Sequence, residues 1–310
     1  MTAAVLVAAV AAVLTPHRVV FVDTVQGAVL RVAELPGEGL AIFAAPDGRA
    51  VVPLQGEDAT AIVGPTGPVE ARPGRVFPLF FADYDRMYVV LPDMLATLSY
   101  PDRLLLERVP LQELSGARRA ACSRDGQLVA IVPAMPGVRA LVLVVGLGSP
   151  MVQRVNLAGE AAHVVVAPTG AFAVVASGDT LEATVLGEPA ARAGLNVGGE
   201  VLSLSLLTNG RNVIAGLASG TAGELVGVRV DPKGQHPLKE RFRTRVPAPV
   251  VAVAAAGEDV AAISGDSLVI LTGGGRRIGR QVPLPGGSDL AVLPDKAKSA
   301  VPAWGDAPKP

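Results

Sequence analysis

The chain has few of the residues that build thiol, metal or cofactor sites. Its only cysteine, Cys122, excludes an internal disulfide and lies in an apolar segment, where we expect a small buried side chain. The three histidines, His17, His163 and His236, include no pair at metal-ligand spacing. Aromatic residues make up 4% of the sequence, which is little for a cofactor held by ring stacking. We therefore expect no metal, no cofactor and no catalytic residue.

Net charge and membrane-length apolar segments are lacking too. The 27 Lys and Arg residues nearly balance 28 Asp and Glu residues, so the net charge is −1 and we expect no nucleic-acid partner. The apolar run Ala3–Leu14 is too short for an ordinary membrane span. Half of the residues are hydrophobic, and 35 Gly and 26 Pro residues interrupt them. This composition indicates a globular body of many short strands.

A turn-like signature followed by an apolar run recurs along the whole chain. The steps between successive signatures are 38, 40, 44, 40, 48 and 38 residues, which is the length of a four-stranded propeller blade. The seven turns are marked by Asp47, Asp85, Asp125, Thr169, Asn209, Gly257 and Asp295. The sequence thus predicts an all-β fold, a seven-bladed β-propeller, as one domain over residues 1–298 with a Pro-rich tail over residues 299–310.

The two ends of the chain are expected to close this ring. Reading backward from Asp47, we expect strands at Leu40–Ala45, Ala28–Glu34, Arg18–Asp23 and Ala4–Val10. The first blade then lacks its innermost strand, and Asp289–Leu293 is a surplus strand that would complete it and remove exposed sheet edges. The alternative for the apolar run is an uncleaved targeting or anchoring segment, which would favour a periplasmic location.

The segment Val19–Val32, followed by Ala45–Gly48, resembles a repeat of the bacterial YVTN and lactonase-like seven-bladed propellers. Similar sequence patterns cover roughly residues 4–296. The motifs are degenerate, because the Kelch glycine doublets, the Asp-box and the Gly-His and Trp-Asp pairs of other propellers are missing. The resemblance implies the fold and a binding role, and it transfers no catalytic residue.

The most distinctive polar segment is Lys239–Arg245, expected on the outermost strand of the sixth blade. Four basic residues of one parity would project from the same face of that strand, namely Lys239, Arg241, Arg243 and Arg245. The equivalent strand of the next blade carries Arg276, Arg277 and Arg280. These residues either protect sheet edges or dock an acidic protein surface or anionic lipid head groups. Trp304 in the tail is a second candidate anchor for a partner.

Two functions are compatible with this pattern. The favoured one is a non-catalytic scaffold or extrinsic subunit that holds other protein subunits in a larger assembly, at a cytoplasmic or peripheral membrane location. An energy-transducing membrane complex, such as a photosynthetic reaction centre, is an example that would fit the basic edge. The alternative is a lactonase-like hydrolase or small-molecule binder using the central channel, which would need acidic side chains such as Asp83, Asp179 and Asp259 to converge. His163, on an inner strand, is expected to be structural.

Overall fold

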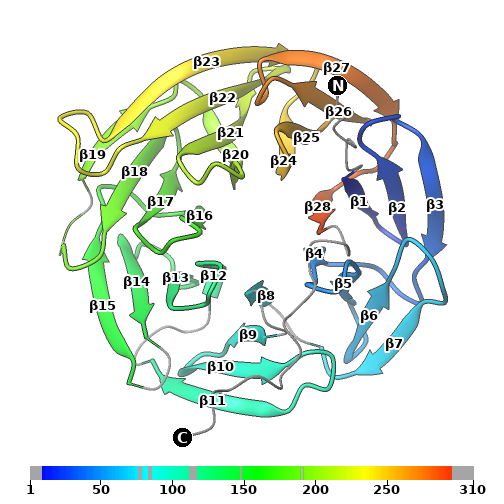
Figure 1. Cartoon of the computed structure of the whole chain (residues 1–310), viewed down its shortest axis with the longest axis horizontal. Coiled ribbons are helices and arrows are strands. Elements are labelled where there is room, and N and C mark those ends of the chain that lie inside the picture. The colour runs from blue at the N-terminus through cyan, green and yellow to red at the C-terminus, as the bar shows by residue number, and fades with distance from the viewer. Residues whose placement is uncertain are drawn as a thin grey trace, which may run out of the picture.

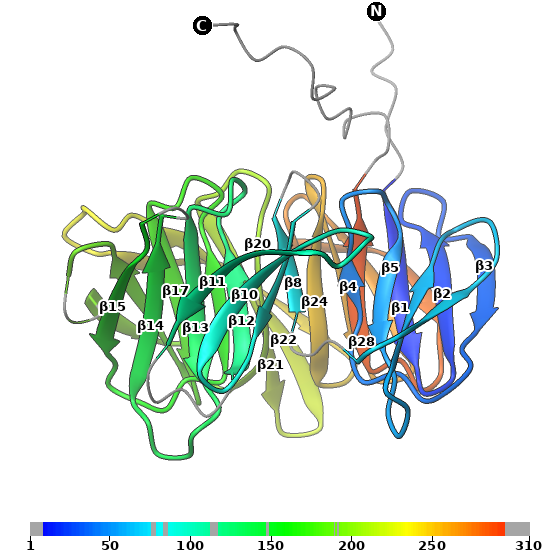
Figure 2. The same ribbon diagram turned by 90° about the horizontal axis from the view of Figure 1, so that it is seen from below.

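The computed structural model describes residues 9–75, 79–82, 86–111, 117–146, 149–188, 190 and 192–294. These residues form seven antiparallel sheets of four strands each, arranged as a ring around a central axis (Figure 1). From the side the blades make a thick disc (Figure 2), and no helix occurs among the described residues. The predicted seven-bladed β-propeller is confirmed.

The strands of each blade run from the central axis to the rim. Blade 1 contains β28 (Asp289–Leu293), β1 (Val10–Thr15), β2 (Arg18–Asp23) and β3 (Val29–Glu34). Blade 2 contains β4 (Phe43–Ala44), β5 (Ala50–Pro53), β6 (Ala59–Val63) and β7 (Glu70–Pro73). Blade 3 contains β8 (Leu79–Ala82), β9 (Arg86–Val90), β10 (Met94–Ser99) and β11 (Leu105–Pro110). Blade 4 contains β12 (Ala117–Cys122), β13 (Leu128–Pro133), β14 (Ala140–Val145) and β15 (Met151–Asn156).

The remaining three blades continue the ring in the same way. Blade 5 contains β16 (His163–Val166), β17 (Phe172–Ser177), β18 (Thr180–Val185) and β19 (Arg192–Asn196). Blade 6 contains β20 (Glu200–Leu206), β21 (Asn212–Ser219), β22 (Ala222–Val230) and β23 (Leu238–Val246). Blade 7 contains β24 (Val250–Ala256), β25 (Asp259–Ser264), β26 (Ser267–Thr272) and β27 (Arg277–Pro283).

The repeated signature is the turn between the first and second strands of a blade. In three blades its Asp or Asn side chain accepts a hydrogen bond from the backbone N–H two residues later, at 2.9–3.0 Å; the acceptors belong to Asp47, Asp125 and Asn209. The following glycine has a positive φ, as at Gly48 and Gly126, which a side chain would strain. The markers Thr169 and Gly257 occupy the equivalent turns of blades 5 and 7, whereas the markers at 85 and 295 lie outside the described residues.

The predicted closure is confirmed, but one strand was placed wrongly. β1 covers Val10–Thr15, where we had expected Ala4–Val10, and it pairs with β28 on one side and β2 on the other. Pro16 and His17 make a two-residue turn, so the six residues directly before them become the strand. The expected strand Leu40–Ala45 is reduced to β4, and residues 1–8 lie outside the described residues.

A buried carboxylate strengthens this closure. The two oxygens of Asp289 accept hydrogen bonds from the backbone N–H of Ile42, at 3.0 Å, and of Leu290, at 2.9 Å. Burial raises the pKa of the Asp289 carboxyl, and these hydrogen bonds oppose the rise. The last strand of the chain is thereby bonded directly to blade 2.

Small aliphatic residues fill the joints between blades. The described residues form seven buried apolar clusters, each contributed by two neighbouring blades. Val and Ala dominate them, and many are fully buried, such as Val13 in blade 1 and Val174 in blade 5. Stacking blade on blade in this way buries both faces of every sheet and leaves the outermost strands and the turns to form the surface.

Candidate functional site

The predicted basic segment lies on β23, the outermost strand of blade 6, but its side chains do not share one face. Gly227 pairs with Phe242 and Val228 pairs with Glu240, so Arg241 is an extra residue in a β-bulge. The bulge reverses the alternation of side chains along the strand. Lys239 therefore projects on the opposite side from Arg243 and Arg245, and the expectation of a single row of four charges is wrong.

Arg243 is also not a free surface charge. Its guanidinium binds the carboxylates of Glu224 and Glu240 and donates a hydrogen bond to the backbone carbonyl of Val197 in blade 5, at 2.9 Å. The hydrogen bonds that Arg243 donates to Glu240 are the main cause that raises the pKa of the Arg243 guanidinium. Arg245 lies 3.6 Å from Glu224, yet its side chain is 88% exposed. Arg243 therefore connects two blades, whereas Arg245 remains accessible.

The equivalent strand of blade 7, β27, continues the basic surface. Arg277 and Arg280 lie on this strand, and Arg280 donates a hydrogen bond to the backbone carbonyl of Gln26 in blade 1. β23 and β27 follow one another around the rim (Figure 1). We define the basic rim as Lys239, Arg245, Arg277 and Arg280, all of which are exposed. Trp304, the other predicted anchor, lies outside the described residues.

Arg276 has a different position, just before β27. Its guanidinium lies over the ring of Phe242 from β23, 5.7 Å from the ring centroid. The hydroxyl of Thr244 donates a hydrogen bond to the carbonyl of Gly275 in the same turn, at 2.9 Å. The turn between β26 and β27 is thereby packed against the outer strand of blade 6.

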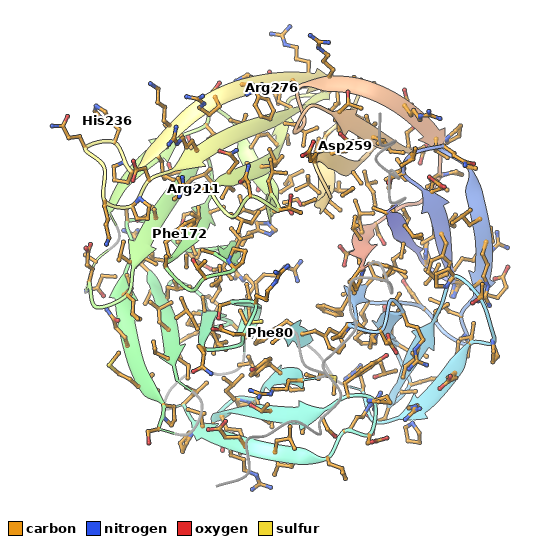
Figure 3. All side chains as sticks on the ribbon, viewed as in Figure 1. Phe80, Phe172, Arg211, His236, Asp259 and Arg276 are labelled. Carbon is orange, nitrogen blue, oxygen red and sulfur yellow. The ribbon has the colours of Figure 1, made fainter. Side chains whose placement is uncertain are left out.

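A pocket of about 660 Å³ opens at this joint of blades 6 and 7. Its walls are the β20–β21, β24–β25 and β26–β27 turns together with parts of β22 and β23. Because strands alternate in direction, all three turns lie on the same face of the disc. Figure 3 shows Arg211 and Arg276 on this part of the ring. We call this site the arginine pocket, and its basic residues are Arg211, Arg229, Arg241 and Arg276.

Among the described residues that line the pocket, four are arginines and Glu258 alone is acidic, so these residues carry a formal excess of three positive charges. Within the described part of the chain, no ion pair involves any of the four arginines. Because of the bulge in β23, Arg241 does not share a face with Arg243, and Arg241 lines the pocket instead. Bulges commonly redirect a side chain next to a binding site.

The innermost strands of blades 4 and 5 carry a second, smaller group of charges. His163 begins β16, and burial lowers the pKa of its imidazole to about 4, with further lowering by the nearby charges of Arg119 and Arg118. At neutral pH the ring is therefore uncharged. The charge of Arg119 is also the smallest of the causes that oppose the raised pKa of Asp289.

The acidic residues that a metal-dependent hydrolase would need do not converge. Asp179 lies between β17 and β18, bound to Thr180 and Asn196, whereas Asp259 follows the β24–β25 turn on the opposite face of the disc. Asp83 lies outside the described residues. No group of three or more potential metal ligands occurs within the described ranges. Nor do these ranges contain a helix long and apolar enough to cross a membrane.

Two of the pocket arginines, Arg241 and Arg276, are among the predicted docking residues, whereas Arg211 and Arg229 were not predicted, because the pocket residues are far apart in the chain. Arg211 follows the marker Asn209, and Arg229 pairs across strands with Asn212. An alignment of the turns of neighbouring blades would show that basic residues follow several of them. The bulge at Arg241 has no comparable signal, because it depends on how β22 and β23 pack.

No family model matches the chain, and no curated protein matches it in sequence. Solved structures do. A protein of unknown function from Desulfotomaculum acetoxidans superposes with a TM-score of 0.71 at 14% identity, covering 92% of this chain and 99% of its own. A candidate 6-phosphogluconolactonase from Bacteroides uniformis gives 0.68 at 11% identity, with 92% and 99% coverage.

A third solved structure has the same fold. The β-propeller domain of Cps50 (Swd1) from Myceliophteria thermophila gives a TM-score of 0.63 at 14% identity, covering 83% of this chain and 93% of that one. At such identities the similarity shows the fold alone. The class of protein is therefore a seven-bladed β-propeller, and its function must be argued from its surface.

Proposed function

We propose that this propeller is a non-catalytic scaffold that binds an acidic protein surface through its basic rim. The observation that carries the proposal is the rim itself: four exposed basic side chains on two consecutive outer strands. An acidic partner that contacts this edge from both sides of β23 would neutralise these charges and speed association. The enzyme alternative has weaker support, since the described acidic residues are separated.

Exposed aliphatic side chains on other outer strands also favour a partner. Leu105 and Leu106 on β11 are 45% and 57% exposed, and Met151 and Val152 on β15 are 51% and 49% exposed. Uncovered apolar edge strands promote association, and natural proteins usually protect them with charges. An assembly that covers these edges while binding the basic rim would explain both features.

The finer parts of the proposal concern family and location. The repeat around Val19–Val32 supports membership of the YVTN and lactonase-like propellers, in which case this chain has kept the fold and a binding role. We place the assembly in the cytoplasm or at the periphery of a membrane, with an energy-transducing complex as one candidate. Anionic lipid head groups would be a second surface for the same basic rim.

Charge reversal on the rim tests the proposal. The triple variant Lys239→Glu, Arg245→Glu, Arg277→Glu should lose co-purification with its partner subunits from the native source, while the Tm stays within about 2 °C because exposed charges contribute little to folding. Raised salt should produce the same release from the wild type. The matched control is Arg154→Glu, which reverses an exposed charge on β15 of blade 4.

Two results would contradict the proposal. Co-purification that survives both the triple reversal and high salt would exclude the basic rim as the docking surface. A stoichiometric divalent ion in the purified protein, together with hydrolysis of a lactone, would favour the hydrolase alternative. Mass spectrometry of the co-purified proteins and elemental analysis of the same sample distinguish these outcomes.

A further inference from the structure

The arginine pocket is almost entirely a hydrogen-bond donor site. Besides its four guanidinium groups, it is lined by Asn209, whose side-chain oxygen already accepts the backbone N–H groups of Arg211 and Asn212. The amide nitrogen of Asn209 is therefore left as a donor. Thr208 donates its own hydroxyl to the carbonyl of Gly257, at 2.8 Å. A complementary ligand must supply several acceptor oxygens.

The walls of the pocket are held in place before any ligand arrives. The backbone N–H of Gly274 donates to the carbonyl of Glu258, at 3.0 Å, and that of Arg276 donates to Thr272, at 3.1 Å. Arg276 is further oriented by the face of Phe242. The turns that carry the pocket and the Arg276 guanidinium are therefore positioned in advance, and groups held in this way lose little conformational entropy on binding.

The concentration of like charge also needs an explanation. Four arginines from four elements line one concave site, no ion pair to them occurs within the described residues, and like charges that line one site repel one another. A concave surface of one sign concentrates the field and raises the local concentration of anions. A bound anion would remove the repulsion, and guanidinium groups match phosphate oxygens in geometry.

We propose that the arginine pocket binds a soluble small molecule that carries a diphosphate or two phosphate groups. Such a ligand brings about two to four negative charges, which suits a formal excess of three positive charges. The volume of about 660 Å³ exceeds what inorganic phosphate needs and lies within the usual range for organic ligands. Glu258 would then face the organic part, where it can accept hydrogen bonds from hydroxyl or amino groups.

This ligand site is independent of the proposed docking function, because the basic rim and the arginine pocket share no residue. Calorimetric titration of the whole chain with pyrophosphate and with ADP at low salt should show binding at one site. The variant Arg211→Gln, Arg229→Gln should weaken it by about tenfold or more. The variant Lys239→Gln, Arg277→Gln is the matched control and should change affinity by less than about twofold.

A variant that is expected to bind pyrophosphate more tightly keeps the test valid, because a misfolded variant could not gain affinity. Glu258→Gln removes the only acidic side chain among the described residues of the pocket and should tighten the binding of pyrophosphate by about threefold. Pyrophosphate should also raise the Tm of the wild type and leave that of the double-glutamine pocket variant unchanged.

Three results would overturn the proposal. One is the absence of pyrophosphate and ADP binding at low salt in folded wild-type protein. Another is binding that the pocket variants leave unaltered. The third is binding only to vesicles that contain a phosphorylated phosphatidylinositol, which would mean that the arginines contact a membrane surface and no soluble ligand.

Discussion

The ring of Phe242 occupies the space that Gly227 leaves open on the neighbouring strand. A Cβ built at residue 227 would lie 2.0 Å from Cε1 of Phe242, far closer than any side-chain contact allows. This packing fixes the register at the bulge, because it holds Phe242 opposite Gly227 and leaves Arg241 unpaired. One glycine thus determines where an arginine of the pocket points.

The first prediction concerns this contact. Gly227→Ala should displace Phe242, disturb the bulge and destabilise the protein by about 1–3 kcal/mol, the usual cost of overpacking a buried site. Urea unfolding measures the change. Gly37→Ala is the control, because a Cβ there would meet no atom closer than 3.8 Å. Equal effects of the two substitutions would show that the contact with Phe242 does not constrain the strand.

The fold was predictable because its determinants are local and repeated. The Asp-Gly turns at Asp47 and Asp125 recur at the blade period. The surplus strand Asp289–Leu293 predicted that the two ends of the chain would pair in one blade and close the ring. The first strand was misplaced because an apolar run of twelve residues contains more than one possible strand, and only the turn at Pro16 selects Val10–Thr15.

The site was less predictable because it depends on contacts between blades. Strict alternation of side chains along β23 predicts four basic side chains on one face, but the bulge at Arg241 breaks this alternation. The acidic partners of Arg243 lie at positions that no local pattern connects, one on β22 and one on β23 itself. Pocket walls built from three separate turns leave no single motif in the sequence.

The second prediction separates two arginines that the sequence treats alike. Arg243→Ala should cost about 1–2 kcal/mol, because it removes charged hydrogen bonds to Glu224, Glu240 and Val197 from a partly covered position. Arg245→Ala should change the free energy of unfolding by less than about 0.5 kcal/mol, since its side chain is 88% exposed. Similar costs for both variants, measured by urea unfolding, would contradict the assignment of Arg243 to the joint between blades 5 and 6.

The third prediction uses the closure. Asp289→Ala removes the acceptor of the Ile42 and Leu290 N–H groups and should destabilise the protein by about 1–3 kcal/mol in mild acid. Burial raises the pKa of Asp289 in the folded state, so folding favours the protonated form. The advantage of the wild type over Asp289→Ala is therefore greatest below the ordinary pKa of an aspartate and declines as pH rises through the raised value.

Unfolding free energies of the wild type and the variant, measured at several pH values from about 4 to 7, test both parts. Asp102→Ala is the control, because Asp102 is exposed, and it should change the stability at neutral pH by less than about 0.5 kcal/mol. A difference between wild type and Asp289→Ala that grows with pH would reverse the sign and contradict the burial of this carboxyl.

The fourth prediction concerns His163 on the innermost strand of blade 5. Its folded pKa of about 4 lies below the ordinary value of 6.5, so between these values the unfolded chain binds a proton that the folded chain does not. His163 should therefore cost the wild type up to about 3 kcal/mol of stability as pH falls from 7 to 4, and His163→Gln should lack this pH-dependent loss. NMR titration of the imidazole gives the pKa directly.

Since burial is the largest cause of the lowered pKa of His163 and the charge of Arg119 is the next, Arg119→Gln should raise this pKa only part of the way to 6.5. A full return to 6.5 in that variant would mean that charge, and not burial, keeps the ring neutral.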